Sequence, residues 1–327
     1  MSFKIADGFT HYASGNPLKR WTASPTIDAS NPIRAGVKAG YRGAGLYAPL
    51  GDLQTATVGL ALRTTVSVGA IIFCYDSIYG HVQCQLVIEP DGSLTFRRGL
   101  NTVLAQSSAG IFPLDDTWHV LECSVMCDST NGIFRVRLDG TEVPGMFQGG
   151  MNTRESASGL LYGLVLSIKP STDLWVSDEF EFLATPAIID TLLPAADGAE
   201  TQWTPTGGGS NHVNVDDPGN IDRDAGYNYS NVTGTTDTFI LSALPSRPGY
   251  AVCCVALSIC ARNEAPGGAR LAPVIRIAGH DYVGAPTALP SADYETFQFL
   301  YATSPATGLP WTDSELAGAQ FGYRVYD

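Results

Sequence analysis

The stretch DDTWHVLECSVMCDSTNGIFRVRLDGTEV, residues Asp115–Val143, decides the fold class of this 327-residue chain. From Trp118 to Met126 apolar and polar side chains alternate along the sequence, which is the two-residue period of a β-strand. A polar turn at Asp128–Gly132 separates this run from a second apolar run, and Asp139-Gly140 follows with a dipeptide favoured in tight hairpins. The pattern predicts two antiparallel strands with a turn between them and a second turn after them.

Short apolar runs of the same kind recur through the first half of the chain. Glu89–Ser93 reads as a hairpin turn that places Val82–Ile88 beside Leu94–Arg97. Evenly spaced short strands without a long 3.6-residue period predict two packed sheets. The expected strands are Val58–Arg63, Val66–Tyr75, His81–Ile88, Leu94–Arg97, Trp118–Met126, Ile133–Leu138, Gly159–Ile168 and Leu174–Leu183.

Composition agrees with an all-β chain. Charged residues make up 16% of the sequence, and 35 Gly and 20 Pro provide frequent turns; the usual charged share is about 25%. We predict two β-sandwich, jelly-roll-like domains, residues 1–185 and 186–327, joined through a connector at Ala184–Ala199. In the second half we expect one short helix at Thr312–Ala317 and strands at Phe239–Leu241, Ala251–Ala261, Leu271–Ile277, Tyr294–Tyr301 and Phe321–Tyr326.

The net charge of -13 argues against nucleic acid, because affinity for phosphate backbones comes mostly from Lys and Arg. The longest apolar run, Tyr250–Ala261, is shorter than the roughly 20 residues that cross a bilayer, so no membrane insertion is expected. The first residues lack the apolar core of a signal peptide, which predicts synthesis in a cytoplasm without export by a signal of its own.

Two resemblances follow from these segments. The order Trp-His, strand, polar turn, strand, Asp-Gly in residues 115–143 resembles the central hairpin of laminin-G-like or concanavalin-like sandwiches, and Leu174–Leu183 resembles their final strand. Residues 190–327 resemble a domain of tailed-bacteriophage virion proteins, through Thr201–Pro205 (TQWTP) and the closing segment Ser304–Thr312 (SPATGLPWT). This second resemblance implies a structural or adsorption protein without a cofactor or catalytic centre.

Three acidic side chains near the end of the first domain are candidates for catalytic groups. Asp178, Glu179 and Glu181 lie on one expected strand, where alternation puts both glutamates on one face as an acid/base pair would require. The Glu-x-Asp-x-x-Glu pattern typical of concanavalin-like glycosidases is absent, and a solvated strand face that discourages edge pairing is the favoured interpretation of the charges. We therefore expect no enzyme and assign no catalytic residue.

The second half offers a weak metal site and several aromatic binding candidates. Hard oxygen ligands for calcium are present in one loop, but their order is not that of an EF-hand, and a solvated acidic loop is the simpler interpretation. Aromatic rings can stack on a sugar or protein partner, although packing explains them too. The calcium candidates are Asp216, Asp217, Asp222 and Asp224, and the binding candidates are Tyr227, Tyr229, Trp203 and Trp311.

Together these observations predict a non-enzymatic structural component of a tailed-bacteriophage virion, at the tail tip or a fibre, made in the bacterial cytoplasm. It would form a homo-oligomer, and it would act either in assembly, by contacting other virion proteins, or in adhesion to a host-surface glycan, with many copies adding avidity. One alternative is a capsid decoration or head fibre protein. Another is a carbohydrate-active enzyme or a secreted lectin.

Overall fold

The computed structural model describes residues 2–8, 26–27, 41–42, 46–66, 68–75, 81–166, 171–216, 223–264, 268–290 and 294–326. The chain divides into two compact units, with the division between Ile189 and Asp190. Each unit is built almost entirely from antiparallel strands, which confirms the all-β fold class.

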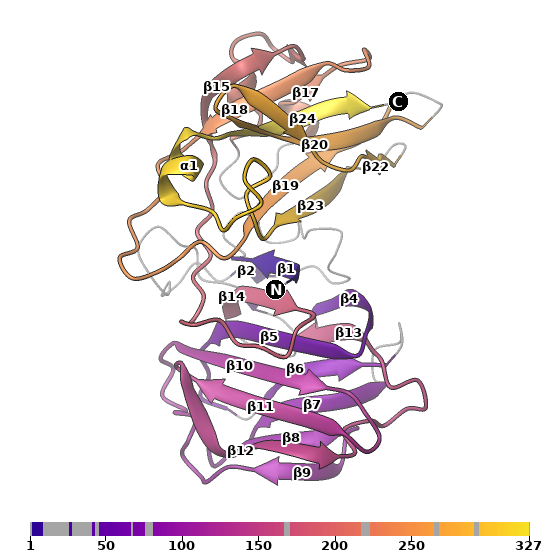
Figure 1. Ribbon diagram of the computed structural model, residues 1–327, viewed down its shortest axis with the longest axis vertical. Coiled ribbons are helices and arrows are strands. Elements are labelled where there is room, and N and C mark those ends of the chain that lie inside the picture. The colour runs from indigo at the N-terminus through magenta and orange to yellow at the C-terminus, as the bar shows by residue number, and fades with distance from the viewer. Residues whose placement is uncertain are drawn as a thin grey trace. The chain divides into compact units, whose positions relative to one another are not determined.

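Unit 1 is a sandwich of two sheets, which Figure 1 shows as layers one behind the other. The eight-stranded sheet has the order β12 (Thr141–Met151), β11 (Gly132–Leu138), β10 (His119–Met126), β5 (Thr55–Leu62), β14 (Ser171–Ser177), β3 (Tyr41–Arg42), β2 (Thr26–Ile27), and β1 (Phe3–Asp7) also pairs with β14. The six-stranded sheet has the order β4 (Leu46–Leu53), β13 (Leu161–Leu166), β6 (Val68–Cys74), β7 (Val82–Ile88), β8 (Leu94–Arg98), β9 (Thr102–Gln106).

The hairpin expected from Asp115–Val143 is present. Strands β10 and β11 pair from Leu121 opposite Leu138 to Met126 opposite Ile133. In the following turn, Asp139 and Gly140 both have positive φ, at 50° and 79°, as a type I′ turn requires. The turn at 89–93 is also confirmed, since Ile88 pairs with Leu94.

The core of unit 1 lies between the two sheets. Leu121, Cys123 and Val125 of β10 are fully buried there. The ring of Phe96 from β8 stacks on Phe134 from β11 with centroids 4.1 Å apart, which joins the six-stranded sheet to the eight-stranded one. Burial of such rings is a large apolar contribution to folding.

Unit 2 contains a six-stranded main sheet that packs on a strand pair. The main sheet has the order β15 (Pro194–Thr201), β18 (Thr236–Leu241), β24 (Gln320–Tyr326), β20 (Arg270–Ile277), β21 (His280–Val283), with β22 (Thr287–Ala288) beside β20. The pair is β19 (Val255–Ala261) with β23 (Glu295–Tyr301), and β16 (Thr204–Pro205) pairs with β17 (Asn228–Tyr229). Phe239, Leu271 and Tyr323 of the main sheet share one core cluster with Ile259 of β19.

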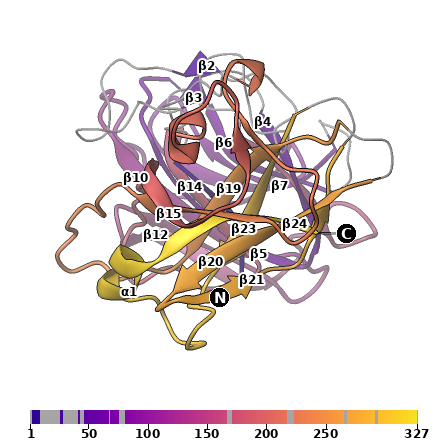
Figure 2. The same cartoon turned by 90° about the horizontal axis from the view of Figure 1, so that it is seen from above.

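Three short helical segments accompany the strands of unit 2. Two are 3-10 turns, η1 (Asn211–Asn214) and η2 (Arg223–Ala225). The expected short helix is confirmed as α1 (Asp313–Gly318), whose N-cap Thr312 accepts a hydrogen bond from the backbone N–H of Glu315. Helix α1 lies at the start of β24 in Figures 1 and 2. No helix in the described residues has the length and apolar character needed to span a membrane.

The structure corrects several boundaries. The expected strand at Leu174–Leu183 ends at Ser177, so Asp178, Glu179 and Glu181 do not alternate across a strand. The expected connector at Ala184–Ala199 contains most of β15, which joins the unit 2 sheet. Strands β9 and β12 were not expected, because their Gly, Gln and Glu residues and exposed faces lack an apolar period.

Replacing Phe134 by Ala tests the contact between the two sheets. We expect a loss of about 3–5 kcal/mol in the free energy of unfolding, because the change leaves a cavity beside Phe96. Phe147→Ala is the matched control, since that ring is 56% exposed, and it should cost less than about 1 kcal/mol. Urea unfolding monitored by fluorescence measures both; equal losses would contradict this packing.

Candidate functional site

An open hollow lies on the outer face of the six-stranded sheet, over strands β8 and β9. Alternation along β8 turns Phe96 into the core and leaves Thr95 and Arg97 on the opposite face. These two residues pair across the ladder with Gln106 and Val103 of β9. The hollow has a volume of about 360 Å³ and is lined by Glu89, Pro90, Asp91, Thr95, Arg97, Val103 and Gln106.

The turn at residues 89–93 forms one wall of the hollow. Gly92 has φ of 75°, and a Cβ added there would lie 2.6 Å from the backbone oxygen of Phe112, so only Gly fits. The Phe112 N–H donates to the Gly92 carbonyl at 2.8 Å, and the Gly110 N–H donates to the Asp91 carbonyl at 2.8 Å. The turn is therefore held by a neighbouring loop, and its acidic side chains start from a fixed backbone.

Polar groups of both signs meet in the hollow. Arg97 Nη2 contacts Glu89 Oε1 at 2.5 Å, and Gln106 Nε2 donates to Ser93 Oγ at 2.8 Å. Hydrogen bonds from the N–H and hydroxyl of Ser93 hold the pKa of the Asp91 carboxyl below its usual range, so it stays ionised. Val103, 52% exposed, adds an apolar surface beside these groups.

Two buried polar atoms of the lining have no hydrogen-bond partner among the described residues. They are the Thr95 hydroxyl oxygen and Arg97 Nε. Buried polar groups in folded proteins are nearly always paired, and leaving one unpaired costs about 1–3 kcal/mol. The hollow therefore combines exposed acceptors and donors with two unpaired atoms of its lining residues that are themselves covered.

A second polar centre lies on the outer face of the eight-stranded sheet. Glu122 of β10 is fully buried, and its Oε2 accepts hydrogen bonds from Nε and Nη2 of Arg137 at 2.8 and 2.6 Å. Glu122 Oε1 and the indole Nε1 of Trp175 have no partner among the described residues. Gly59 lies on β5, which pairs with β10 of Glu122 on one side and with β14 of Trp175 on the other. A Cβ at Gly59 would lie 2.2 Å from the indole Nε1, so the glycine leaves space for the Trp175 ring.

The segment 178–189 covers this second centre. The Glu179 carbonyl accepts from Thr57 Oγ1 at 2.5 Å, and the Leu183 carbonyl accepts from Arg137 Nη2 at 2.8 Å. Burial beneath this segment raises the pKa of Glu122, and the contact with Arg137 offsets only part of that effect. A raised pKa is a property of catalytic acids, but this carboxyl has no exposed surface through which a substrate could reach it.

The aromatic candidates of unit 2 separate into buried and exposed rings. Trp311 is 4% exposed, packs in the core and donates from Nε1 to the Tyr301 carbonyl at 2.9 Å. Trp203 is half-buried against Tyr323, with centroids 4.6 Å apart. Tyr229 is 52% exposed, and its ring lies 6.2 Å from that of Tyr227. Packing therefore accounts for both Trp rings, while Tyr229 presents an accessible ring.

The calcium candidates are not brought together in the described residues. Asp217 and Asp222 lie outside them, and Asp216 is half-buried. Asp224 contacts Arg262 at 2.8 Å and accepts a hydrogen bond from the Tyr294 hydroxyl at 3.2 Å. Within the described ranges no group of three or more His, Cys, Asp and Glu side chains could hold a metal ion.

The acidic residues 178–181 are likewise dispersed. Asp178 pairs with Lys4 at 2.9 Å, and Glu181 lies 4.0 Å from Arg135. Neither the hollow nor the Glu122 centre was predicted from the sequence. The sequence feature that could have indicated Glu122 is a carboxylate inside an alternating strand. For the hollow, the corresponding feature is the acidic turn between two paired strands.

No protein-family model and no curated protein matches this sequence. The chain is similar in structure to domain 4 of AbnA, an extracellular GH43 arabinanase from Geobacillus stearothermophilus, at 16% identity and a TM-score of 0.33, covering 54% of this chain and 91% of that one. It is also similar to the catalytic domain of a glycoside hydrolase family 131 protein from Coprinopsis cinerea, at 11% identity and a TM-score of 0.33, covering 58% of this chain and 99% of that one. A Trypanosoma rangeli sialidase matches at 9% identity and 0.36, covering 53% of this chain and 30% of that one.

These matches correct one prediction. The chain was expected not to be an enzyme, and that exclusion is wrong, because the structures it is similar to include the catalytic domain of a glycoside hydrolase. At these identities and TM-scores the similarity assigns no activity and no substrate to this chain.

Replacing Glu122 by Gln tests the buried acid through the pH dependence of stability. The folded-state pKa of Glu122 lies above the ordinary 4.5, so protonation of this carboxyl stabilises the native chain. This stabilisation is fully present at pH values below the unfolded-state pKa. It is lost as the pH rises through the folded-state pKa. The wild-type protein should therefore gain stability relative to Glu122→Gln as pH falls from neutral toward 4.5. Urea unfolding at several pH values measures this; a difference that shrinks with falling pH would show a lowered pKa instead.

Proposed function

We propose that this chain is a carbohydrate-binding β-sandwich protein, and that the hollow over β8 and β9 of unit 1 is its binding site. The observation that carries the proposal is the lining itself. It places carboxylates, an amide and a guanidinium beside an apolar surface, with two unsatisfied polar atoms beneath them. Sugars present hydroxyl groups and C–H faces together, so this mixture fits their chemistry.

The volume of the hollow fits a small part of a glycan. Ligand sites span about 300–1,000 Å³, and about 360 Å³ lies at the lower end of that range. The carboxylates of Glu89 and Asp91 would accept hydrogen bonds from sugar hydroxyls, and Arg97 and Gln106 would donate them. Val103 would pack on the apolar face of the ring. Weak single-site affinity follows, because the hollow is open and buries only one side of a ligand.

The charges of the site favour neutral sugars over acidic ones. Arg97 is already paired with Glu89, and Asp91 stays ionised beside them. The three groups together carry one net negative charge, and the whole chain carries -13. An acidic sugar would therefore meet like charge, whereas a neutral sugar would not.

Placement in a phage particle remains a prediction from the sequence. The same holds for location in the virion, for contacts with other virion proteins and for adhesion to a host glycan. Glycan binding by the hollow is compatible with an adsorption protein and with a carbohydrate-active enzyme, so it does not depend on either.

Isothermal titration calorimetry with neutral disaccharides tests the site. Maltose, cellobiose, lactose and xylobiose serve as probes, and we expect at least one of them to bind the full chain. Val103→Asp should weaken that binding about tenfold or more, because it replaces the apolar contact by a further negative charge. Leu100→Asp is the matched control, since Leu100 is 53% exposed against 52% for Val103 and does not line the hollow.

Gln106→Leu gives an independent readout at an exposed polar group of the hollow. Gln106 is exposed, so the change should cost less than about 1 kcal/mol in the free energy of unfolding. Binding should weaken about tenfold, because a sugar hydroxyl would lose the amide as its hydrogen-bond partner. Binding unchanged in both Val103→Asp and Gln106→Leu would overturn the assignment of the site.

A further inference from the structure

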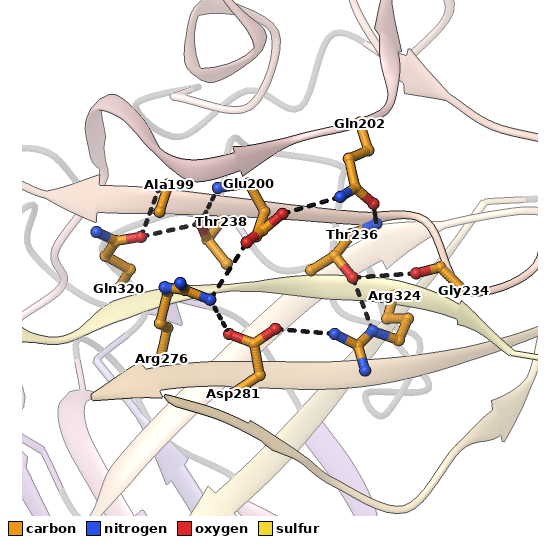
Figure 3. Close-up of polar contacts among 10 residues, drawn as sticks. All are labelled: Ala199, Glu200, Gln202, Gly234, Thr236, Thr238, Arg276, Asp281, Gln320 and Arg324. Atoms are coloured by element: carbon orange, nitrogen blue, oxygen red, sulfur yellow. Dashed lines mark hydrogen bonds and ion pairs between the residues drawn. The ribbon is translucent and has the colours of Figure 1, made fainter. Parts of the chain in front are cut away.

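The outer face of the main sheet in unit 2 holds a closed ring of polar side chains (Figure 3). Glu200 of β15 and Asp281 of β21 lie on opposite sides of the ring, and Arg276 of β20 and Arg324 of β24 lie between them. Arg276 Nη1 contacts Glu200 Oε1 at 3.3 Å and Asp281 Oδ1 at 2.5 Å, and Arg324 Nη2 contacts Asp281 Oδ2 at 2.8 Å.

Two uncharged residues close the ring. Arg324 Nε donates to Thr236 Oγ1 at 2.7 Å, the Thr236 N–H donates to Gln202 Oε1 at 3.0 Å, and Gln202 Nε2 donates to Glu200 Oε2 at 2.8 Å. The four charged side chains are 18–28% exposed. Beneath them the small side chains of Thr238, Ala272 and Val274 are fully buried. The charges therefore form a flat layer over a close-packed face.

The order of charges around the ring makes the face complementary to itself. Acid and arginine alternate at its four corners, so a two-fold axis in the plane of the face can bring Glu200 opposite Arg276 of the partner subunit and Asp281 opposite Arg324 of the partner subunit. A two-fold interface applies each such contact twice. The contacts of Arg276 within the ring use Nη1, which leaves its Nη2 donors for a facing carboxylate.

Exposed apolar side chains surround the ring on the same face. Alternation places Ile240 of β18 two residues beyond Thr238, Val283 two residues beyond Asp281, and Tyr326 two residues beyond Arg324. They are 44%, 38% and 41% exposed. Five strands about 4.8 Å apart and about seven residues long give a face of roughly 550 Å² in projection. That is of the order of the about 800 Å² that each partner buries in a standard interface.

We propose that this face of unit 2 is the interface of a two-fold homodimer, in which a second copy of the chain covers the charged ring and its apolar surround. The proposal goes beyond glycan binding and does not depend on it. Pairing by charge in a partly exposed layer makes the dimer sensitive to ionic strength, so it weakens as salt rises.

Sedimentation equilibrium of the full chain tests the interface. As its concentration is raised to about 0.1 mM, the wild-type protein should reach twice the mass of the chain. An interface of this size is expected to have a Kd within that concentration range. Arg276→Glu places like charges opposite each other twice per dimer and should raise Kd about tenfold or more. Arg262→Glu is the matched control, because Arg262 is also paired with two acids, Asp224 and Glu264, but lies on none of the strands of this face, and it should leave Kd unchanged.

Val283→Asp gives a second test that leaves the ring intact. It places a new negative charge in the apolar surround and should also raise Kd, while Leu309→Asp, at a 64% exposed position outside the sheet, should not. Circular dichroism of each variant checks that the fold is kept. A wild-type protein that sediments as a monomer, or a dimer that neither Arg276→Glu nor Val283→Asp weakens, would overturn the proposal.

Discussion

Cross-strand register at the centre of the eight-stranded sheet is the constraint on which the rest of unit 1 depends. Strands β5 and β10 pair without a bulge from His119 opposite Leu62 to Met126 opposite Thr55. A shift of one residue would exchange the two faces of a strand, moving Leu121, Cys123 and Val125 out of the core and Glu122 into it. The Asp139-Gly140 turn sets the pairing of Leu138 of β11 with Thr141 of β12, and Asp139 Oδ1 accepts a hydrogen bond from the Val120 N–H of β10 at 2.8 Å. The strand register therefore determines at once which side chains form the core, that Glu122 is covered, and which side chains face outward.

In both units, the sheet face opposite the core carries polar side chains. These faces differ in how their polar groups find hydrogen-bond partners. Around Glu122 the segment 178–189 supplies backbone carbonyls and excludes solvent. On the unit 2 sheet the charged side chains satisfy one another in a ring. Over β8 and β9 the lining is satisfied only in part, with Thr95 Oγ1 and Arg97 Nε unpaired among the described residues. Unpaired atoms also occur at the covered Glu122 centre, so the open lining with its exposed polar groups is what distinguishes the hollow as a place for a ligand.

Local signals in the sequence were enough for the strands with a clear period and for the hairpins with turn dipeptides, such as the turn after β11 and the one between β7 and β8. Strands β9 and β12 escaped because exposed polar residues there follow no apolar period, and their pairing comes from the neighbouring strand rather than from propensity. The hollow could not be predicted, because Glu89, Arg97 and Gln106 converge only through the register of three strands. Packing was the favoured interpretation of Trp203 and Trp311 from the sequence, and in the structure Trp311 is buried and Trp203 is half-buried against Tyr323.

The central claim is that the outer face of β8 and β9 receives a neutral sugar. Amide chemical shifts of the full chain, followed by nuclear magnetic resonance during titration with whichever neutral disaccharide binds, locate that contact directly. The account predicts that the largest shifts belong to the lining of the hollow, at Asp91, Thr95, Arg97 and Val103. Saturable shifts confined to unit 2, around Tyr229 for example, would contradict it.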